Sequence, residues 1–178
     1  MKKNDQPILF ATLGLPGSGK TTFSRKFAKE FHFLYLNSDR IRRALFIKPK
    51  YTKAEHDLVF PAMDALAEDA LKNGISIIYD ANSTKRAYRR AMMQTAKKYG
   101  ARFFLLTFDI SVVTAKKRLD IRRRCTSNMC KDYHPPAPHA ILERLKTSIE
   151  KPTKKEPTIF IQGTSTYAQQ KKEVLRFL

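Results

Sequence analysis

The 178-residue sequence contains no tryptophan, only two cysteines and no run of 18 apolar residues. Without such a run we expect no membrane-spanning helix. The apolar run Ile8–Leu13 near the N-terminus is also too short for a signal peptide. Two cysteines without an export signal argue against a disulfide-stabilised secreted fold and favour a reducing compartment. We therefore predict a cytoplasmic protein that has no membrane partner.

Acidic residues are scarce: 16 Asp and Glu stand against 35 Lys and Arg, which gives a net charge of +19. The imbalance is largest from Ala81 to Lys131, where fourteen Lys and Arg face only Asp109 and Asp120, a local net of +12. A positive field of this strength attracts polyanions such as nucleotides, phosphorylated substrates or nucleic acid. A solvated basic surface without a dedicated partner explains the same composition equally well.

Apolar runs alternate with helical stretches along the whole chain, with no internal repeat or linker. We therefore predict a single domain over residues 1–178. Such alternation is typical of an α/β fold in which right-handed crossovers build a parallel sheet covered on both faces. The predicted fold is a three-layer sandwich with a five-stranded parallel sheet, the strands lying at residues 7–13, 33–36, 75–79, 102–108 and 158–161.

Helix boundaries follow from capping residues and from the spacing of apolar side chains. Ser38 is the expected N-cap of a short helix over 39–45. Thr52 opens a longer helix to Lys72 that Pro61 should kink or divide. A further helix is expected over 83–99, with Tyr88 on its buried face.

Residues 14–21 read Gly-Leu-Pro-Gly-Ser-Gly-Lys-Thr and fit the Walker A pattern G-x-x-x-x-G-K-[ST]. The glycines let successive backbone N–H groups turn toward a β-phosphate, and the following helix presents its positive end to the same group. Lys20 can reach the β- and γ-phosphate oxygens, and the Thr21 hydroxyl can ligate Mg²⁺. The motif predicts binding of ATP and Mg²⁺ through Gly14, Pro16, Gly17, Ser18, Gly19, Lys20, Thr21 and Thr22.

Asp39 follows directly after the second predicted strand. Ligand sites of open α/β sheets gather at the carboxyl ends of strands, so Asp39 could accept the proton of an attacking acceptor hydroxyl. Arg42, three residues on, would lie on the same helical face and could hold an anionic part of the acceptor. The alternative is that Asp39 only complements the dipole of a helix N-terminus.

Asp80 ends the third predicted strand, the arrangement of a Walker B site, and would hold Mg²⁺ directly or through water. Position 81 is alanine, where motor ATPases commonly carry a glutamate that polarises water, so the sequence favours transfer over hydrolysis. Asn82 either hydrogen-bonds near the phosphates or the acceptor, or is an ordinary turn residue.

Four segments together resemble the small P-loop kinases often described as AAA-type ATP-binding proteins, relatives of the polynucleotide 5′-kinases. They are the Walker segment, Asn37–Arg42, Tyr51-Thr52 and Asp80–Asn82, and an Arg-rich helix later in the chain adds to the resemblance. The resemblance covers about residues 7–165, and an Asp-x-x-Arg after strand two is its more specific part. It implies a nucleotide-kinase-like fold with a helical lid over about residues 118–140.

The same resemblance implies a role for several side chains. Asp39 would be the general base and Arg42 would contact an acceptor phosphate. Arg118 and Arg122, on the lid, would embrace the donor nucleotide, and Arg122 together with Lys20 would offset charge on the transferred group. The loop Gly163–Ser165 would pass beside the adenine, although a plain connection explains it as well.

The predicted lid also holds four candidate zinc ligands: Cys125, Cys130, His134 and His139. Their spacing is not that of a C-x₂-C knuckle, and the intervening prolines stiffen the stretch, so we expect no zinc site there.

The leading hypothesis is an ATP-dependent kinase. Its acceptor is either the 5′-hydroxyl of a polynucleotide or nucleoside, or a small molecule such as a sugar or an antibiotic. A nucleotide-dependent binding module that hydrolyses ATP slowly is the rival of a different class.

Overall fold

The computed structural model describes residues 6–124 and 139–178, with the backbone alone described at 139–141. Its five strands form one sheet in the order β2-β3-β1-β4-β5, and every pairing is parallel. The strands are β1 (Ile8–Gly14), β2 (Leu34–Asn37), β3 (Ile77–Asn82), β4 (Arg102–Asp109) and β5 (Thr158–Gln162). The predicted five-stranded parallel sheet is confirmed.

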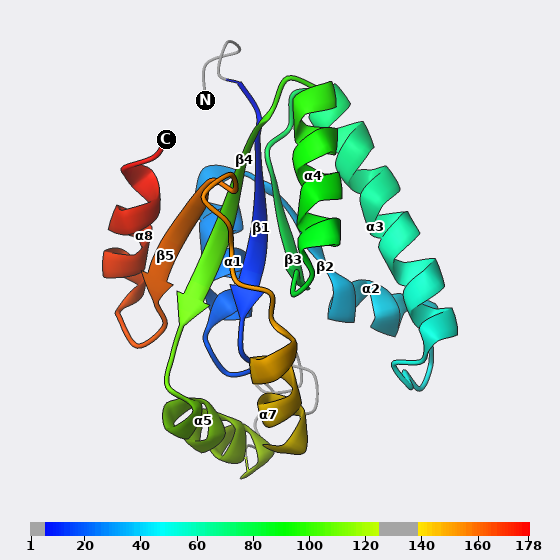
Figure 1. The fold of residues 1–178 in the computed structure, drawn as a ribbon. Helices are drawn as coiled ribbons and strands as arrows, with labels where there is room; N and C mark the ends of the chain where they lie inside the picture. Colours follow the sequence, from blue (N-terminus) through cyan, green and yellow to red (C-terminus); the bar gives the residue numbers. More distant parts are fainter. Residues whose placement is uncertain (1–5, 125–138) are drawn as a thin grey trace.

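Helices cover both faces of the sheet, which gives the three layers predicted (Figure 1). They are α1 (Lys20–Phe31), α2 (Ser38–Leu45), α3 (Lys53–Lys72), α4 (Arg86–Lys98), α5 (Val112–Arg124), α7 (His139–Ser148) and α8 (Tyr167–Leu175). Helices α1 and α8 pack on one face and α3 and α4 on the other, while α5 and α7 lie beyond the carboxyl ends of the strands (Figure 1).

The central strand β1 is buried at every residue, because helices flank it on both faces. Its side chains alternate between two cores, as the period-two geometry of a strand requires. Leu9 and Leu13 join the core beneath α3 and α4, whereas Phe10 joins the core beneath α1. Phe10 meets Phe27 of α1 edge to face, with 5.8 Å between ring centroids, a favoured aromatic geometry.

Two predictions about helix ends and interiors are wrong. The N-cap of α2 is Asn37 rather than Ser38: its side chain accepts a hydrogen bond from the Arg40 amide at 2.8 Å. Of the two outcomes predicted at Pro61, a kink or a division, the division is wrong, because α3 is one helix from Lys53 to Lys72. Proline removes a single intrahelical hydrogen bond, and the buried neighbours Val59 and Met63 anchor the helix on either side.

Helix α4 also starts later than predicted, at Arg86. The Ser83 amide instead donates to the Thr12 carbonyl at 3.1 Å, which keeps this part of the chain extended along β1. Near its start the buried face differs as well: Tyr88 is 65% exposed and Arg89 is buried. Further along the helix the predicted face is correct, because Ala96 is buried and Met92 and Tyr99 pack against the same core, so only Tyr88 departs from it.

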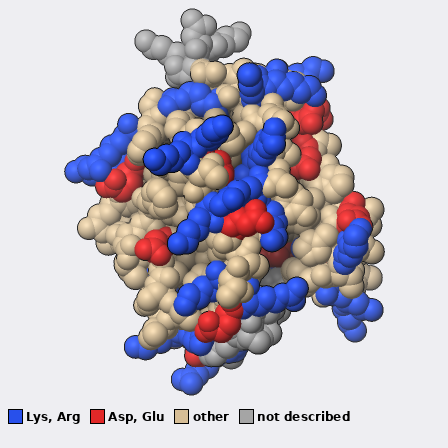
Figure 2. Space-filling model, viewed as in Figure 1, with Lys and Arg blue, Asp and Glu red and all other residues tan. Residues whose placement is uncertain are grey.

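The basic stretch 81–131 is partly neutralised by the fold. Among the described residues, at least five cations of this stretch form ion pairs: Lys85, Arg89, Lys98, Lys116 and Arg123. Four of the five acids come from outside the stretch. Figure 2 shows Lys and Arg spread over the visible face with Asp and Glu between them, rather than gathered in one patch.

Among the helices of the described ranges, none has both the length and the apolar character needed to cross a bilayer.

Candidate functional site

The glycine-rich loop joins β1 to α1 with a backbone that favours glycine. Gly17 and Gly19 have φ angles of 83° and 99°, in the region that other residues seldom adopt. A Cβ on Gly17 would lie 3.0 Å from the Ala115 carbonyl, so the loop also packs closely on α5. Helix α1 begins at Lys20, which directs its N–H groups and positive dipole end to this loop. The segment therefore has the form of an anion-binding nest.

Lys20 lies at the centre of the site. Its Nζ donates to the carbonyls of Gly14 at 2.7 Å and Leu15 at 3.0 Å. Burial lowers the pKa of Lys20 to about 8, and the positive charge of Arg122 acts in the same direction, while Asp80 and Asp39 oppose both. Three residues predicted from three other segments, Asp39, Asp80 and Arg122, thus lie within electrostatic reach of Lys20.

Asp80 is buried at the end of β3, and three side chains hold its carboxylate. Tyr35 and Asn37 of β2 donate to Oδ2 at 2.7 and 2.8 Å, and Thr12 of β1 donates to Oδ1 at 3.2 Å. Burial and then the neighbouring Asp80 charge raise the pKa of Tyr35, so this phenol stays a donor. Spacing along the sequence does not predict these partners, although Thr12 stands out as a polar residue inside an apolar run.

These oxygens suit a magnesium ion. An ionised carboxylate offers about four lone-pair positions, and three at Asp80 accept hydrogen bonds. The carboxylate and the hydroxyl of Thr21 are the hard ligands that Mg²⁺ prefers. Within the described residues, no group of three or more His, Cys, Asp or Glu could hold a metal alone. A magnesium ion held by Asp80 and Thr21 would therefore take its other ligands from nucleotide and water.

Asp39, which the sequence predicts to face the acceptor, lies partly exposed in the first turn of α2. Its Oδ1 accepts a hydrogen bond from the hydroxyl of Tyr51 at 3.3 Å. Tyr51 has a φ of 58°, unusual for a residue with a side chain. The Glu55 carboxylate holds this turn by accepting from the backbone amides of Lys50 and Tyr51, both at 2.7 Å.

Arg42 is 2% exposed and lies beneath the same turn. Its Nε is 3.2 Å from Glu55 Oε2, and its guanidinium is 4.5 Å from the centroid of the Tyr51 ring. The arginine is therefore engaged with Glu55 and Tyr51, and its contact with an acceptor stays a prediction. Asn82, at the end of β3, has a buried Oδ1 that accepts no hydrogen bond from the described residues.

Both predicted lid arginines lie on α5. Nη1 of Arg118 donates to the Gly17 carbonyl at 3.1 Å, and Arg122 lies near Lys20, as its effect on the lysine pKa indicates. The loop after β5 also contacts the P-loop, because a Cβ on Gly163 would lie 2.6 Å from the Ser18 carbonyl.

The candidate zinc ligands Cys125, Cys130 and His134 lie outside the described residues, as does the side chain of His139. The remainder of the predicted lid is α5 and the start of α7.

A buried strand, a glycine-rich loop carrying a lysine, and an acid at the end of the adjacent strand define a P-loop nucleotide-binding protein. Residues 9–152 match the AAA domain family, and the chain belongs to that family.

Similar proteins include kinases. The chain is 29% identical over 96 residues to the L-seryl-tRNA(Sec) kinase of Methanococcus maripaludis, a match that spans 51% of this chain and 36% of the relative. It is 27% identical to a chain of the Pnkp1/Rnl/Hen1 RNA repair complex, with a TM-score of 0.67 over 84% of this chain and 46% of that one. The APS kinase CysC of Mycobacterium tuberculosis, solved with AMPPNP and APS, shares the fold: 17% identity, TM-score 0.65 and 96% of each chain covered. The resemblance to small P-loop kinases is confirmed.

The pKa of Lys20 predicts how nucleotide affinity depends on pH. Bound phosphates favour the charged lysine, so affinity should be greatest below the free-state pKa of about 8 and should fall as pH rises through it. The decline should approach about tenfold per pH unit. Calorimetry of ADP binding in two buffers of different ionisation enthalpy should show uptake of about half a proton at pH 8. Proton-neutral binding at pH 8 would contradict the prediction.

Proposed function

We propose that this protein is an ATP-dependent phosphotransferase that moves the γ-phosphoryl group of ATP to an acceptor hydroxyl. The observation that carries the proposal is the contrast between the two carboxylates near Lys20. Three side chains donate to the carboxylate of the buried Asp80 and fix its orientation, which suits a ligand of a metal ion. Asp39, by contrast, is partly exposed and accepts one long hydrogen bond from Tyr51, which leaves it accessible to an acceptor.

Each residue then has a role in transfer. The N–H groups of the loop and the start of α1 bind the phosphates, and Lys20 and Arg122 offset charge that develops on the transferred group. The Asp39 carboxylate accepts the proton of the attacking hydroxyl. Asp80 and Thr21 would hold Mg²⁺, which supplies charge neutralisation at the β- and γ-phosphates. Alanine at position 81 leaves no glutamate after Asp80 to activate water, which supports transfer over hydrolysis.

The acceptor class has two candidates. The tRNA kinase and the RNA repair complex among the similar proteins support a nucleic-acid or nucleoside hydroxyl. The likeness to an APS kinase fold is compatible with a small-molecule acceptor. The five ion pairs of the basic stretch weaken the charge argument for nucleic acid, because a paired cation attracts a polyanion less strongly than an unpaired one.

Labelled ATP supplied with pools of nucleosides, oligonucleotides, sugars and aminoglycosides tests the proposal. A kinase should label one pool and should consume ATP at least tenfold faster with that pool than without it. Slow ATP consumption unaffected by every pool would favour the nucleotide-dependent binding module.

Salt dependence distinguishes the two acceptor classes. If about five phosphates are contacted, the log–log slope of oligonucleotide affinity against salt should be roughly −4.5 for duplex and −3.5 for a single strand. A variant lacking three exposed cations of the stretch, Arg90→Ala/Lys117→Ala/Arg124→Ala, should flatten that slope. The matched control Lys29→Ala/Lys72→Ala/Lys154→Ala removes the same charge elsewhere. Fluorescence titration of a labelled oligonucleotide measures both, and a flat wild-type slope would leave the small-molecule acceptor.

A further inference from the structure

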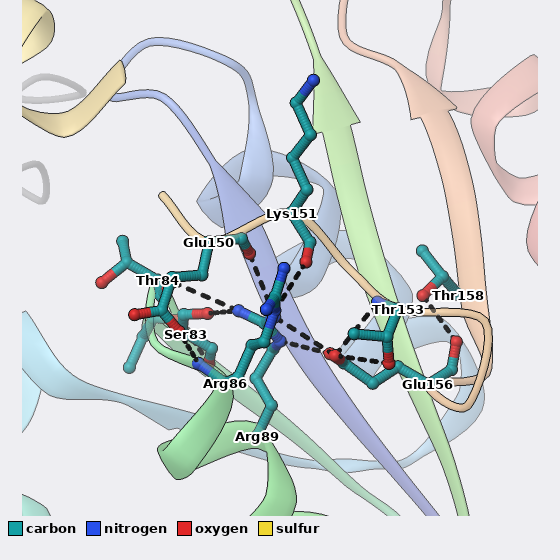
Figure 3. Close-up of polar contacts among 10 residues, drawn as sticks. Ser83, Thr84, Arg86, Arg89, Glu150, Lys151, Thr153, Glu156 and Thr158 are labelled. Carbon is teal, nitrogen blue, oxygen red and sulfur yellow. Dashed lines mark hydrogen bonds and ion pairs between the residues drawn. The ribbon is translucent and has the colours of Figure 1, made fainter. Parts of the chain in front are cut away.

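Among the described residues, the most buried cation that the proposed chemistry does not use is Arg89 of α4, which is 0% exposed. It faces Glu156, which lies on the segment that leads from α7 to β5 (Figure 3). Removing a guanidinium from water is unfavourable unless the charge is paired and every donor is satisfied. The surroundings of Arg89 meet both conditions.

All five N–H donors of Arg89 have acceptors in three places (Figure 3). Nε and Nη2 donate to the two oxygens of the Glu156 carboxylate at 2.5 and 3.3 Å. Nη1 donates to the carbonyls of Ser83 at 2.9 Å and Thr84 at 3.2 Å. The second donor of Nη2 reaches the Glu150 carbonyl at 3.0 Å. Lysine could not satisfy this set, because its donors diverge from one nitrogen.

The first of these segments leads directly to the site. Ser83 and Thr84 follow Asp80 and Asn82 of β3 without a break. The Thr84 amide also donates to the Asn82 carbonyl at 2.7 Å, so the turn that Arg89 holds extends to Asn82.

The second segment leads to the lid. Glu150 comes two residues after the end of α7, and its amide donates to the Thr84 carbonyl at 3.0 Å. Its carboxylate accepts from the Arg86 amide at 2.8 Å and from Lys85 Nζ at 3.3 Å. From here the chain crosses the α4 side of the sheet to reach β5 (Figure 1). The buried Arg89 therefore links the segment that follows β3 to the segment that follows α7.

We infer that Arg89 is a positioning residue for phosphoryl transfer: it fixes the Asn82–Thr84 turn, and so the acceptor side of β3, against the chain that anchors α7. This inference rests on the proposed function. A buried ion pair adds little to stability over apolar packing of the same volume, but its fixed geometry specifies how three segments are oriented. Misplacement of a site by about 1 Å can lower a rate by 10²-fold.

The test compares two variants. Arg89→Lys keeps the charge but cannot donate to all the carbonyls. Glu156→Gln keeps the shape of the side chain but weakens its two-point pairing with Arg89. Hydrogen exchange should quicken in both segments, 82–86 and 142–152, although these lie about sixty residues apart in the sequence. With the acceptor identified by the labelling screen, kcat should fall roughly 10- to 10²-fold. The Kd for ADP should stay within about threefold, because all five donors of Arg89 are engaged outside the phosphate-binding loop.

The control is Lys98→Met/Glu68→Gln, which removes an exposed ion pair of 3.1 Å between the same helix and α3. It should change neither exchange in the two segments nor kcat. Faster exchange confined to α4, or an unchanged kcat in a folded variant, would overturn the inference. If Arg89→Lys fails to fold, Glu156→Gln carries the same comparison. A wild-type protein that labels no acceptor would contradict the proposed function, and the positioning role with it, whereas the exchange measurements would still show whether Arg89 holds the two segments together.

Discussion

Lys20→Ala should lower the rate of ATP turnover by at least roughly 10²–10³-fold, the usual effect of removing one donor to developing charge. Lys20 lies where the P-loop meets α1, within electrostatic reach of Asp39, Asp80 and Arg122, so its loss removes a cation from the centre of the site. Nucleotide affinity should fall as well, since the lysine side chain faces the phosphate-binding loop.

The fold should survive this substitution. Burial lowers the pKa of Lys20 to about 8, which means that the folded protein holds the charged lysine less favourably than the unfolded chain does. The melting temperature of Lys20→Ala at pH 7 should therefore equal or exceed that of wild type. Lys29→Ala, an exposed lysine in the last turn of the same helix, is the matched control and should leave turnover unchanged. Turnover of Lys20→Ala within tenfold of wild type would remove Lys20 from the mechanism.

Asp39→Asn should lower phosphoryl transfer by roughly 10²–10⁴-fold, the usual contribution of a positioned base. The amide keeps the size of the side chain but cannot accept the hydroxyl proton. Affinity for ADP should change little below pH 7, because Asp39 is proposed to face the acceptor. Pre-steady-state measurement of a single turnover separates this chemical step from product release.

A second measurement on Asp39→Asn checks the placement of the residue independently of its role. The Asp39 carboxylate raises the pKa of Lys20 in the wild-type site. Its neutralisation should therefore move the pH at which ADP affinity declines to a lower value. Asp57→Asn, an exposed acid of α3 paired with Lys53, should move neither the pH profile nor the rate. A mutant that loses ADP binding but retains its transfer rate would place Asp39 on the metal side.

The sequence alone predicted the sheet, the phosphate-binding loop and the two acids, because each depends on local patterns. Strand β1 is apolar, and the loop that follows it contains glycines with positive φ angles, which other residues seldom adopt. The local sequence therefore specifies both the strand and the turn. Asp80 likewise ends an apolar run, and parallel strands bring such ends to one edge.

Only the tertiary structure decided which polar groups meet across the fold. Asp80 takes its partners from β1 and β2, Arg42 pairs with Glu55, and Arg89 turns inward to a glutamate 67 residues away. Tyr88 was expected inside and is exposed, whereas Arg89 is buried: hydropathy places a charged residue outside, and only the distant Glu156 makes its burial favourable. The same long-range pairing neutralised part of a basic stretch that had looked continuous in sequence, because charge on a folded surface depends on neighbours in space.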